Sequence, residues 1–242
     1  MKIVAKTDVG LVRKQNQDSY NTGELSNGAA WAVVCDGMGG AAGGAVASSV
    51  AVKMISEKIV NCYRDGLGEN TVRNIVVSAV ESANACLFDM SESSDELYGM
   101  GTTVVALIAD GDIAYIAHVG DSRAYVIRNG GITQLTRDHS VVAQMIERGE
   151  ITREEAKSHP DRHIITRAVG VNDKINVDFL SVEIEQGDIL LVCTDGLSGF
   201  VTEEDMLSLT ADGQYHKFAD RLVSLANKKG GSDNITVVAF VK

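Results

Sequence analysis

Proline is nearly absent from this chain of 242 residues, which contains only Pro160. A chain with so little proline carries no proline-rich linker. Aromatic residues make up only 5% of it, and lysine and arginine form no cluster, while the formal net charge is −11. An acidic chain without a basic patch is a poor ligand for nucleic acid or an anionic membrane. We therefore expect neither nucleic acid nor a membrane as a partner.

Two further absences concern the cysteines and the long apolar runs. The cysteines have no CxxC spacing and no small disulfide scaffold around them, so we expect free thiols at Cys35, Cys62, Cys86 and Cys193. No stretch reaches the roughly 18 apolar residues of a membrane span, and the N-terminus has no signal-peptide core. With 45% hydrophobic residues, the sequence predicts one globular cytoplasmic domain over residues 1–242.

Hydrophobic periodicity predicts where the strands and helices lie. Strands are expected near 2–7, 30–36, 101–109, 112–119, 122–128, 131–136, 175–184, 188–194 and 234–241, and helices over 42–61, 70–90, 139–148, 203–210 and 215–229. Tight turns at 109–112 and 129–131 predict largely antiparallel sheets. Because two long helices follow one another, we expect central sheets with helices packed outside. The polar stretch 137–170 is expected to form a flap over one end of the sheets.

The segment WAVVCDGMGG, residues 31–40, ends an apolar strand with Asp36 and a run of glycines. A Walker A loop is excluded because no Lys-Ser/Thr pair follows the glycines. Residues 37–42 do fit the dinucleotide pattern G-x-G-x-x-A, but the helix at 70–90 lies where a parallel strand is required. In the third interpretation the Asp36 carboxylate and the Gly37 carbonyl are oxygen ligands of a hard metal ion.

Three more aspartates lie at the ends of predicted strands: Asp121, Asp195 and Asp233. Each of them alone is explained as a turn-forming residue. Together with Asp36, however, four carboxylates at strand ends would repel one another unless a cation lay between them. The sequence therefore favours a metal site over four independent turns.

Seven motifs follow one another along the chain. They are GLVRKQNQD (10–18), DGMGG (36–40), GMGTT (99–103), GDSR (120–123), LTRDHS (135–140), TDGL (194–197) and GSDNIT (231–236). Each is common alone, but the ordered set resembles the metal-dependent serine/threonine protein phosphatases of type 2C, in their bacterial single-domain form. This resemblance covers nearly the whole chain. It implies an α+β fold, a four-layer αββα sandwich of two mainly antiparallel sheets flanked by helices.

The resemblance also implies a set of metal ligands for Mn²⁺ or Mg²⁺. Asp36 would bridge two ions at the core of the site. Asp195 and Asp233 would complete the coordination of the first ion, and the Gly37 carbonyl would bind the second. A third ion is implied at Asp121, with help from Asp195.

Other residues match the family's supporting positions. Arg13 matches the phosphate-binding arginine, and its guanidinium suits bidentate contact with a phosphoryl group. Gln17, Asp18 and Asn234 stand beside the implied ligands. Gln17 replaces a glutamate found in many members, and because its amide brings no charge we expect a higher metal requirement. The catalytic residues implied are Arg13, Asp36, Asp195 and Asp233.

The motifs do not identify the general acid of the reaction. Met38 stands where eukaryotic members have a histidine that is thought to protonate the leaving oxygen. Water at the metal site is the first candidate for that role, His139 the second and His163 the third. His118 lies in an apolar strand and is expected to be a hydrogen-bonded core residue.

The implied activity is hydrolysis of phosphoserine and phosphothreonine without a covalent enzyme intermediate. Two metal ions about 3.5–4 Å apart would activate water and clamp the phosphate. The expected substrates are cytoplasmic phosphoproteins, a serine/threonine kinase among them, and the expected state is a monomer. Two alternatives are a dinucleotide-dependent enzyme and a catalytically silent phosphoprotein-binding module on the same fold. Silent members typically lose metal ligands, whereas all four aspartates are present here.

Overall fold

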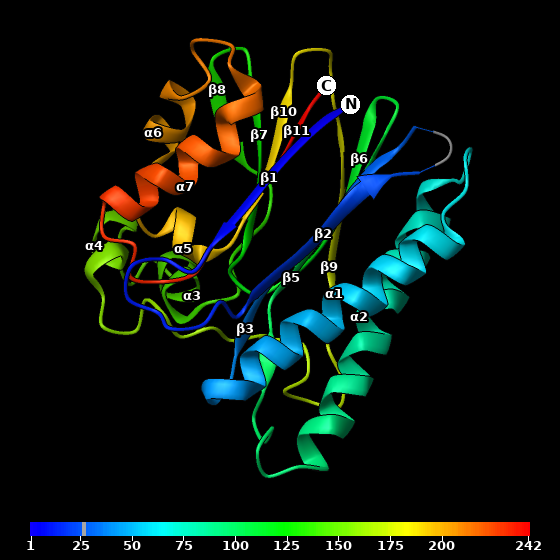
Figure 1. Cartoon of the computed structure of the whole chain (residues 1–242), viewed down its shortest axis with the longest axis vertical. Coiled ribbons are helices and arrows are strands. Elements are labelled where there is room, and N and C mark those ends of the chain that lie inside the picture. Colours follow the sequence, from blue (N-terminus) through cyan, green and yellow to red (C-terminus); the bar gives the residue numbers. More distant parts are fainter. Residues whose placement is uncertain (26–27) are drawn as a thin grey trace.

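Two antiparallel sheets lie face to face between two groups of helices in the computed structural model of the chain (Figure 1). The structure describes residues 1–25 and 28–242, the side chains at 41 and 42 excepted. The first sheet has the strand order β1 (Lys2–Asp8), β11 (Ile235–Val241), β10 (Ile189–Cys193), β7 (Arg123–Arg128) and β8 (Gly131–Gln134). The second has the order β2 (Asp18–Glu24), β3 (Ala30–Met38), β5 (Val104–Asp110), β6 (Ile113–Val119) and β9 (Asp178–Glu183), and the short β4 (Gly101–Thr102) extends it beside β3.

The helices cover the outer face of each sheet. The long helices α1 (Gly40–Cys62) and α2 (Glu69–Glu92) pack on the second sheet. The first sheet is covered by α5 (Asp195–Ser198), α6 (Glu203–Ser208) and α7 (Phe218–Lys228). Two further α-helices, α3 (Val141–Glu147) and α4 (Arg153–Ser158), lie in the segment between β8 and β9, and a short 3-10 helix η1 (Tyr215–Lys217) precedes α7. The predicted four-layer sandwich of α+β class is therefore confirmed.

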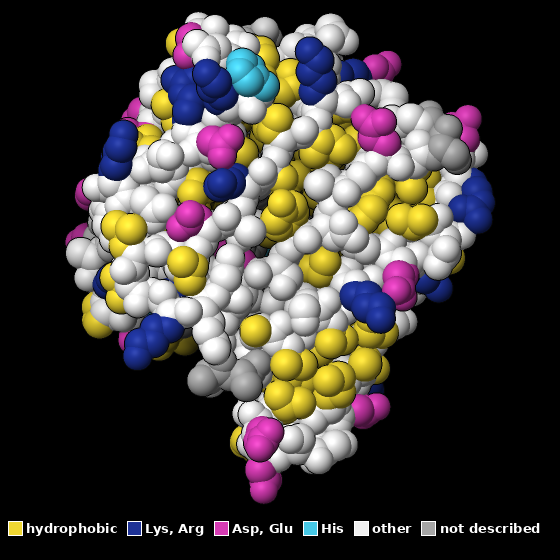
Figure 2. All heavy atoms as spheres, viewed as in Figure 1, with side chains coloured by type: hydrophobic (Ala, Val, Ile, Leu, Met, Phe, Trp, Pro, Cys, Tyr) yellow, Lys and Arg dark blue, Asp and Glu magenta, His cyan; other side chains and the backbone are white. Residues whose placement is uncertain are grey.

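The central strands are apolar on both faces because each face belongs to a different core. In β3 the side chains alternate between the helices and the other sheet: Trp31, Val33 and Cys35 face the helices, whereas Ala30, Ala32 and Val34 face the first sheet. A strand buried on both sides reads as a continuous apolar run, which explains the pattern around residues 30–36. Hydrophobic side chains of the layer between the sheets are visible in Figure 2 along the seam between β1 and β2.

Several predicted elements differ from those in the structure. Strand β2 was not predicted, because its sequence DSYNTGE is polar and it lies at the edge of its sheet. The strand predicted over 101–109 is divided into β4 and β5, which pair with β3 in the same register. Between them the Asp36 N–H donates to the hydroxyl of Thr103. The helix α4 was missed because it is short, although Thr152 and Glu155 form a capping box at its start.

The topology also excludes the dinucleotide-binding alternative. The strand β3, which precedes the glycines, pairs only with antiparallel neighbours among the described residues. The helix α1 leads into α2 and not into a parallel strand, so the required βαβ unit is absent from the described part of the chain.

Within the described ranges, none of the helices is long and apolar enough to cross a membrane.

Phe240 provides a test of the layer between the sheets. Its side chain is 1% exposed and belongs to the core between them. We expect Phe240→Ala to lower the free energy of unfolding by about 3–5 kcal/mol, because the cavity adds to the lost burial. Denaturant unfolding measures this loss. Tyr98→Ala, at a position 75% exposed, is the control and should change it by less than about 0.5 kcal/mol. Equal losses in the two variants would contradict the assignment of this core.

Candidate metal centre

Four aspartates from different elements line one pocket of about 880 Å³. Asp36 belongs to β3, and Asp121 lies in the turn between β6 and β7. Asp195 begins α5, one residue beyond the end of β10, and Asp233 lies one residue before the start of β11. The structure thus brings together the four carboxylates that the sequence singled out. Their role as metal ligands stays a prediction at this point.

The backbone of Asp36 is fixed at both of its polar groups. Its N–H donates to Thr103 Oγ1 at 2.9 Å. Its carbonyl accepts from the Thr103 N–H at 2.9 Å and from Thr102 Oγ1 at 2.8 Å. The sequence analysis included both threonines in a motif without giving them a role. The available signal was a pair of hydroxyl side chains directly before a buried strand.

Burial and like charge raise the pKa values of the clustered carboxyls. Burial raises the pKa of Asp36 well above its ordinary range, and the carboxylates of Asp18 and Asp195 raise it further. Burial and then Asp195 raise the pKa of Asp121 to about 8. Burial and Asp233 also raise the pKa of Asp195, although a hydrogen bond with the Asp36 carboxyl lowers it in part. The pocket therefore disfavours four bare negative charges.

Asp18 lies behind the pocket and joins the two sheets. It stands opposite Asp36 in the pairing of β2 with β3. Its Oδ2 accepts from the hydroxyls of Thr194 at 2.9 Å and Thr236 at 2.7 Å, which belong to the other sheet's side of the molecule. Its Oδ1 is buried without a partner among the described residues. Burial raises the pKa of Asp18 to about 7.

The donor set of the pocket fits a hard divalent cation. One oxygen of Asp195, Oδ1, is buried and has no hydrogen-bond partner in the described part of the chain. A buried oxygen without a partner is costly unless a ligand satisfies it. Carboxylate oxygens and a backbone carbonyl are the ligands that Mg²⁺ and Mn²⁺ prefer. Gly37 lines the same pocket, and a Cβ there would lie 2.0 Å from the Gly44 carbonyl oxygen.

Arg13 reaches the cluster from the N-terminal segment. Its Nη2 donates to Asp233 Oδ2 at 2.8 Å, and its side chain is 50% exposed. The bond to Asp233 raises the pKa of the guanidinium, and the Asp36 and Asp195 carboxylates raise it further. Arg13 is thus a cation at the mouth of an acidic pocket, with part of its guanidinium accessible to a ligand.

Asn234 fixes the segment that carries Arg13. Its Nδ2 donates to the carbonyls of Val9 at 2.9 Å and Gln15 at 3.0 Å. Its Oδ1 accepts from the Gln17 N–H at 2.8 Å. All of these bonds hold the N-terminal loop against the residue that follows Asp233. The supporting position given to Asn234 therefore has a physical basis in these contacts.

Gln17 lines the pocket, and its amide is already in use. Its Nε2 donates to the Gly40 carbonyl at 2.8 Å, and its backbone carbonyl accepts from the Gly37 N–H at 3.1 Å. The side chain thus connects the N-terminal loop to the start of α1. Within the described residues no hydrogen bond of its Oε1 is recorded, so this oxygen can accept from water.

The three side chains considered in connection with proton transfer lie in different places. Met38 and His163 line the pocket, and His163 is exposed. His139 is 6% exposed and lies outside the pocket lining. His163 is therefore better placed than His139 to reach a ligand, which reverses their order in the sequence analysis. His118 is a buried residue, as expected, but neither of its ring nitrogens has a hydrogen-bond partner among the described residues, so the expectation of a hydrogen-bonded side chain was wrong.

Comparison with known proteins identifies similar chains. A family model described as protein phosphatase 2C matches residues 12–236. The serine/threonine phosphatase stp of Listeria monocytogenes serotype 4b is 38% identical over 237 residues, which are 96% of this chain and 92% of that protein.

Solved structures agree in fold along the whole length. The serine/threonine phosphatase of S. agalactiae has a TM-score of 0.93 and 34% identity, and the match covers 100% of this chain and 99% of that one. The catalytic domain of the serine/threonine protein phosphatase PstP, in complex with two manganese ions, has a TM-score of 0.85 and 33% identity. That match covers 98% of this chain and 96% of the PstP chain.

The raised pKa values predict how the stability of the metal-free protein changes with pH. Asp121 and Asp18 have pKa values of about 8 and about 7 in the folded chain, against an ordinary value of 3.8. As the pH falls through this range the folded state binds protons that the unfolded chain does not, so the protein becomes more stable. Buried His118, whose pKa is lowered to about 4 from 6.5, opposes this gain only below about pH 6.5.

We therefore expect the melting temperature in EDTA to be higher near about pH 6.5 than near about pH 8.5. Thermal unfolding followed by circular dichroism checks this. Asp121→Asn should reduce the difference, whereas Asp212→Asn, at an exposed carboxylate bound to Arg221, should leave it unchanged. With Mn²⁺ present the trend should disappear, because a metal ion requires deprotonated ligands. A lower melting temperature at the more acidic pH in EDTA would contradict the raised pKa values.

Proposed function

This chain belongs to the protein phosphatase 2C family and shares its serine/threonine phosphatase activity, and we propose that Asp36, Asp195 and Asp233 hold the divalent ions on which that activity depends. The single observation that carries this proposal is that the three carboxylates line one pocket. The buried, unpartnered Oδ1 of Asp195 supports it further. A catalytically silent module would not need this ligand set.

The metal centre would contain two ions at Asp36 and a third at Asp121. Mn²⁺ or Mg²⁺ suits the oxygen ligands, and such ions polarise phosphoryl oxygens and lower the pKa of water to near neutrality. Asp36 comes from the second sheet, whereas Asp195 and Asp233 come from the first sheet's side. Because these residues lie at the ends of buried strands, their positions are held by the whole sandwich. That rigidity suits a reaction in which positioning and electrostatics supply most of the catalysis.

Arg13 would bind the phosphoryl group of the substrate. Its guanidinium uses Nη2 for Asp233, which leaves other N–H groups to donate to phosphoryl oxygens. The bond to Asp233 also orients the guanidinium before the substrate arrives. Arg13 thus places the phosphoryl group next to the carboxylates that would hold the ions.

The proton for the leaving seryl or threonyl oxygen would come from water in the pocket. His139 cannot supply it directly, because its ring is buried and bonded to Gly120 and Asp178. His163 lines the pocket and lowers the pKa of Asp195 by its charge when protonated, so it is the second candidate.

The substrates would be phosphorylated proteins. The pocket lining includes the basic side chains Arg13 and Lys14, which suit the charge of a phosphorylated side chain. We infer that a serine/threonine kinase is among the substrates and that the enzyme acts as a monomer in the cytoplasm. The net charge of −11 argues against nucleic acid and anionic membranes as partners.

The proposal predicts the behaviour of two conservative variants. We expect Asp36→Asn and Asp233→Asn to lose at least about 100-fold in Mn²⁺-dependent release of phosphate from a phosphothreonine peptide, since each removes a charged ligand. The control is Asp212→Asn, which removes an exposed carboxylate bound to Arg221 and should keep full activity. Calorimetric titration with Mn²⁺ separates loss of metal from loss of fold. Full activity in either pocket variant would contradict the proposed centre.

Gln17 predicts a specific metal requirement. A carboxylate at this position would add a charge that acts on the ions through water, worth about 1 kcal/mol or roughly fivefold in affinity. We therefore expect Gln17→Glu to reach half-maximal activity at about one fifth of the parent's Mn²⁺ concentration, despite losing the bond to the Gly40 carbonyl.

Gln15→Glu is the matched control, because Gln15 lines the same pocket and the change adds the same charge. An equal gain in both variants would attribute the effect to the net charge of the pocket. No gain in Gln17→Glu would contradict a role for this position.

A further inference from the structure

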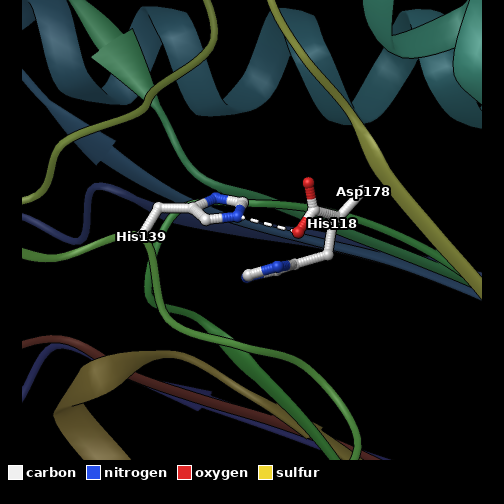
Figure 3. A group of neighbouring side chains, drawn as sticks. All are labelled: His118, His139 and Asp178. Atoms are coloured by element: carbon white, nitrogen blue, oxygen red, sulfur yellow. Dashed lines mark hydrogen bonds and ion pairs between the residues drawn. The ribbon is translucent and has the colours of Figure 1, made fainter. Parts of the chain in front are cut away.

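A polar cluster of two buried histidines and a partly exposed aspartate lies beside Gly120, the residue before Asp121. It consists of His118 in β6, Asp178 at the start of β9 and His139 in the loop before α3 (Figure 3). His118 and Asp178 are partners in the pairing of β6 with β9. The rings of His118 and His139 lie against each other, with centroids 4.7 Å apart. None of these side chains lines the pocket, and the proposed hydrolysis gives them no task.

His139 holds the peptide groups on both sides of Gly120. Its Nδ1 accepts from the Gly120 N–H at 2.9 Å, and its own backbone N–H donates to the Gly120 carbonyl at 2.8 Å. Gly120 has a φ of 108°, and a Cβ there would lie 2.5 Å from Cγ2 of Thr103. Gly120 is thus fixed between His139 and Thr103. Asp121 is the next residue, so this contact sets the direction in which its carboxylate leaves the chain.

The hydrogen bonds also fix the proton on the ring of His139. Because Nδ1 accepts a hydrogen bond, the proton of the neutral ring must be on Nε2. Nε2 lies 3.1 Å from Asp178 Oδ2 and donates to it, as the dashed line in Figure 3 marks. The other oxygen of Asp178 accepts from Arg167 Nη1 at 2.6 Å. Asp178 therefore holds the ring of His139, and Arg167 holds Asp178.

We propose that His139 is a positioning residue for Asp121, kept in place by Asp178 and Arg167. This inference rests on the proposed function, in which Asp121 holds a divalent ion. The chain of contacts runs from Arg167 through Asp178 and His139 to Gly120, and the Asp121 carboxylate extends from its end into the pocket. Partners behind a ligand commonly change metal affinity by about 10- to 100-fold when they are removed.

The same residue connects the metal centre to the flap. The His139 carbonyl accepts from the Thr166 N–H at 2.8 Å, and Ser140 forms a bridge with Ile165. Ile165 and the nearby His163 line the pocket. His139 is therefore bonded both to Gly120, next to Asp121, and to Thr166, next to the pocket residue Ile165.

A metal ion held by the cluster itself is the main rival. His118, His139 and Asp178 each offer a ligand atom, and these atoms lie within 4.8 Å of one another. For His139, however, Nδ1 is occupied by the Gly120 N–H and Nε2 carries the proton. Coordination through Nε2 would require an imidazolate or the loss of the Gly120 bond. The cluster is therefore built as a hydrogen-bonded support for the turn.

Two substitutions separate the two ends of the ring. In His139→Asn the amide oxygen lies near the position of Nδ1 and can still accept from Gly120, although the contact with Asp178 is lost. In His139→Gln the amide extends toward Asp178, but Gly120 loses its acceptor. Mn²⁺ binding is measured by calorimetric titration, together with the melting temperature, and Asp121→Asn identifies the ion that depends on Asp121.

We expect His139→Gln to weaken the Asp121-dependent ion by about tenfold or more. His139→Asn should bind it within about threefold of the parent, and neither variant should change the Asp36-dependent ions. Asp178→Asn, which keeps an oxygen for Nε2, should give an intermediate loss. Equal Mn²⁺ affinity in the parent and His139→Gln would overturn the proposal. Equal losses of Mn²⁺ affinity in the Asn and Gln variants, in proportion to a fall in melting temperature, would also overturn it.

Other outcomes separate this proposal from the proposed function. A parent that binds no Mn²⁺ would overturn the proposed function, and the positioning role with it. A parent whose Mn²⁺ binding is lost in Asp36→Asn but unchanged in Asp121→Asn would overturn the positioning role alone. Titration with Co²⁺ tests the rival, because a visible spectrum of a tetrahedral ion that disappears in His118→Leu would place a metal ion in the cluster and overturn the proposed support.

Discussion

Mutual repulsion between carboxylates is the constraint on which the arrangement of this molecule depends. The four pocket aspartates would move apart if their backbones were free. They do not, because Asp36 is fixed by Thr102 and Thr103 and Asp121 follows a glycine held on both sides. Arg13 neutralises only part of the charge, through Asp233. The remaining negative charge must be neutralised by protons or by divalent cations. The fold that holds these carboxylates together therefore also creates the need for a metal ion.

Asp18 shows how the two sheets are kept in register around that charge. It belongs to β2 in the second sheet, but its carboxylate accepts hydrogen bonds from two threonines of the first sheet's side. Thr194 directly follows β10, and Thr236 lies in β11. A buried carboxylate with one satisfied oxygen has a raised pKa and a cost in stability. In return, the ends of the two sheets are joined at the level of Asp36. The sandwich can then bring carboxylates from both sheets to one pocket.

The sequence predicted those parts of the structure in which a residue pattern is typical of one kind of element. Apolar runs that end in Asp36 and Asp195 predicted buried strands and the aspartates at their ends, because a short strand buried on both faces has this pattern. The polar edge strand β2 has no such pattern and was missed. The role of Thr103 and the unpartnered nitrogens of His118 depend on contacts between distant segments, which periodicity does not report.

His139 illustrates the same limit at a functional position. In the sequence it was a candidate proton donor because histidine titrates near neutral pH. Its fold context gives it other work, since Nδ1 is occupied by Gly120 and Nε2 by Asp178. Burial lowers the pKa of His139, against the opposing effect of Asp178, and Arg167 lowers it further, which favours the neutral ring that the two bonds require. A histidine held in this way is better suited to support the turn that carries Asp121 than to exchange a proton with a substrate.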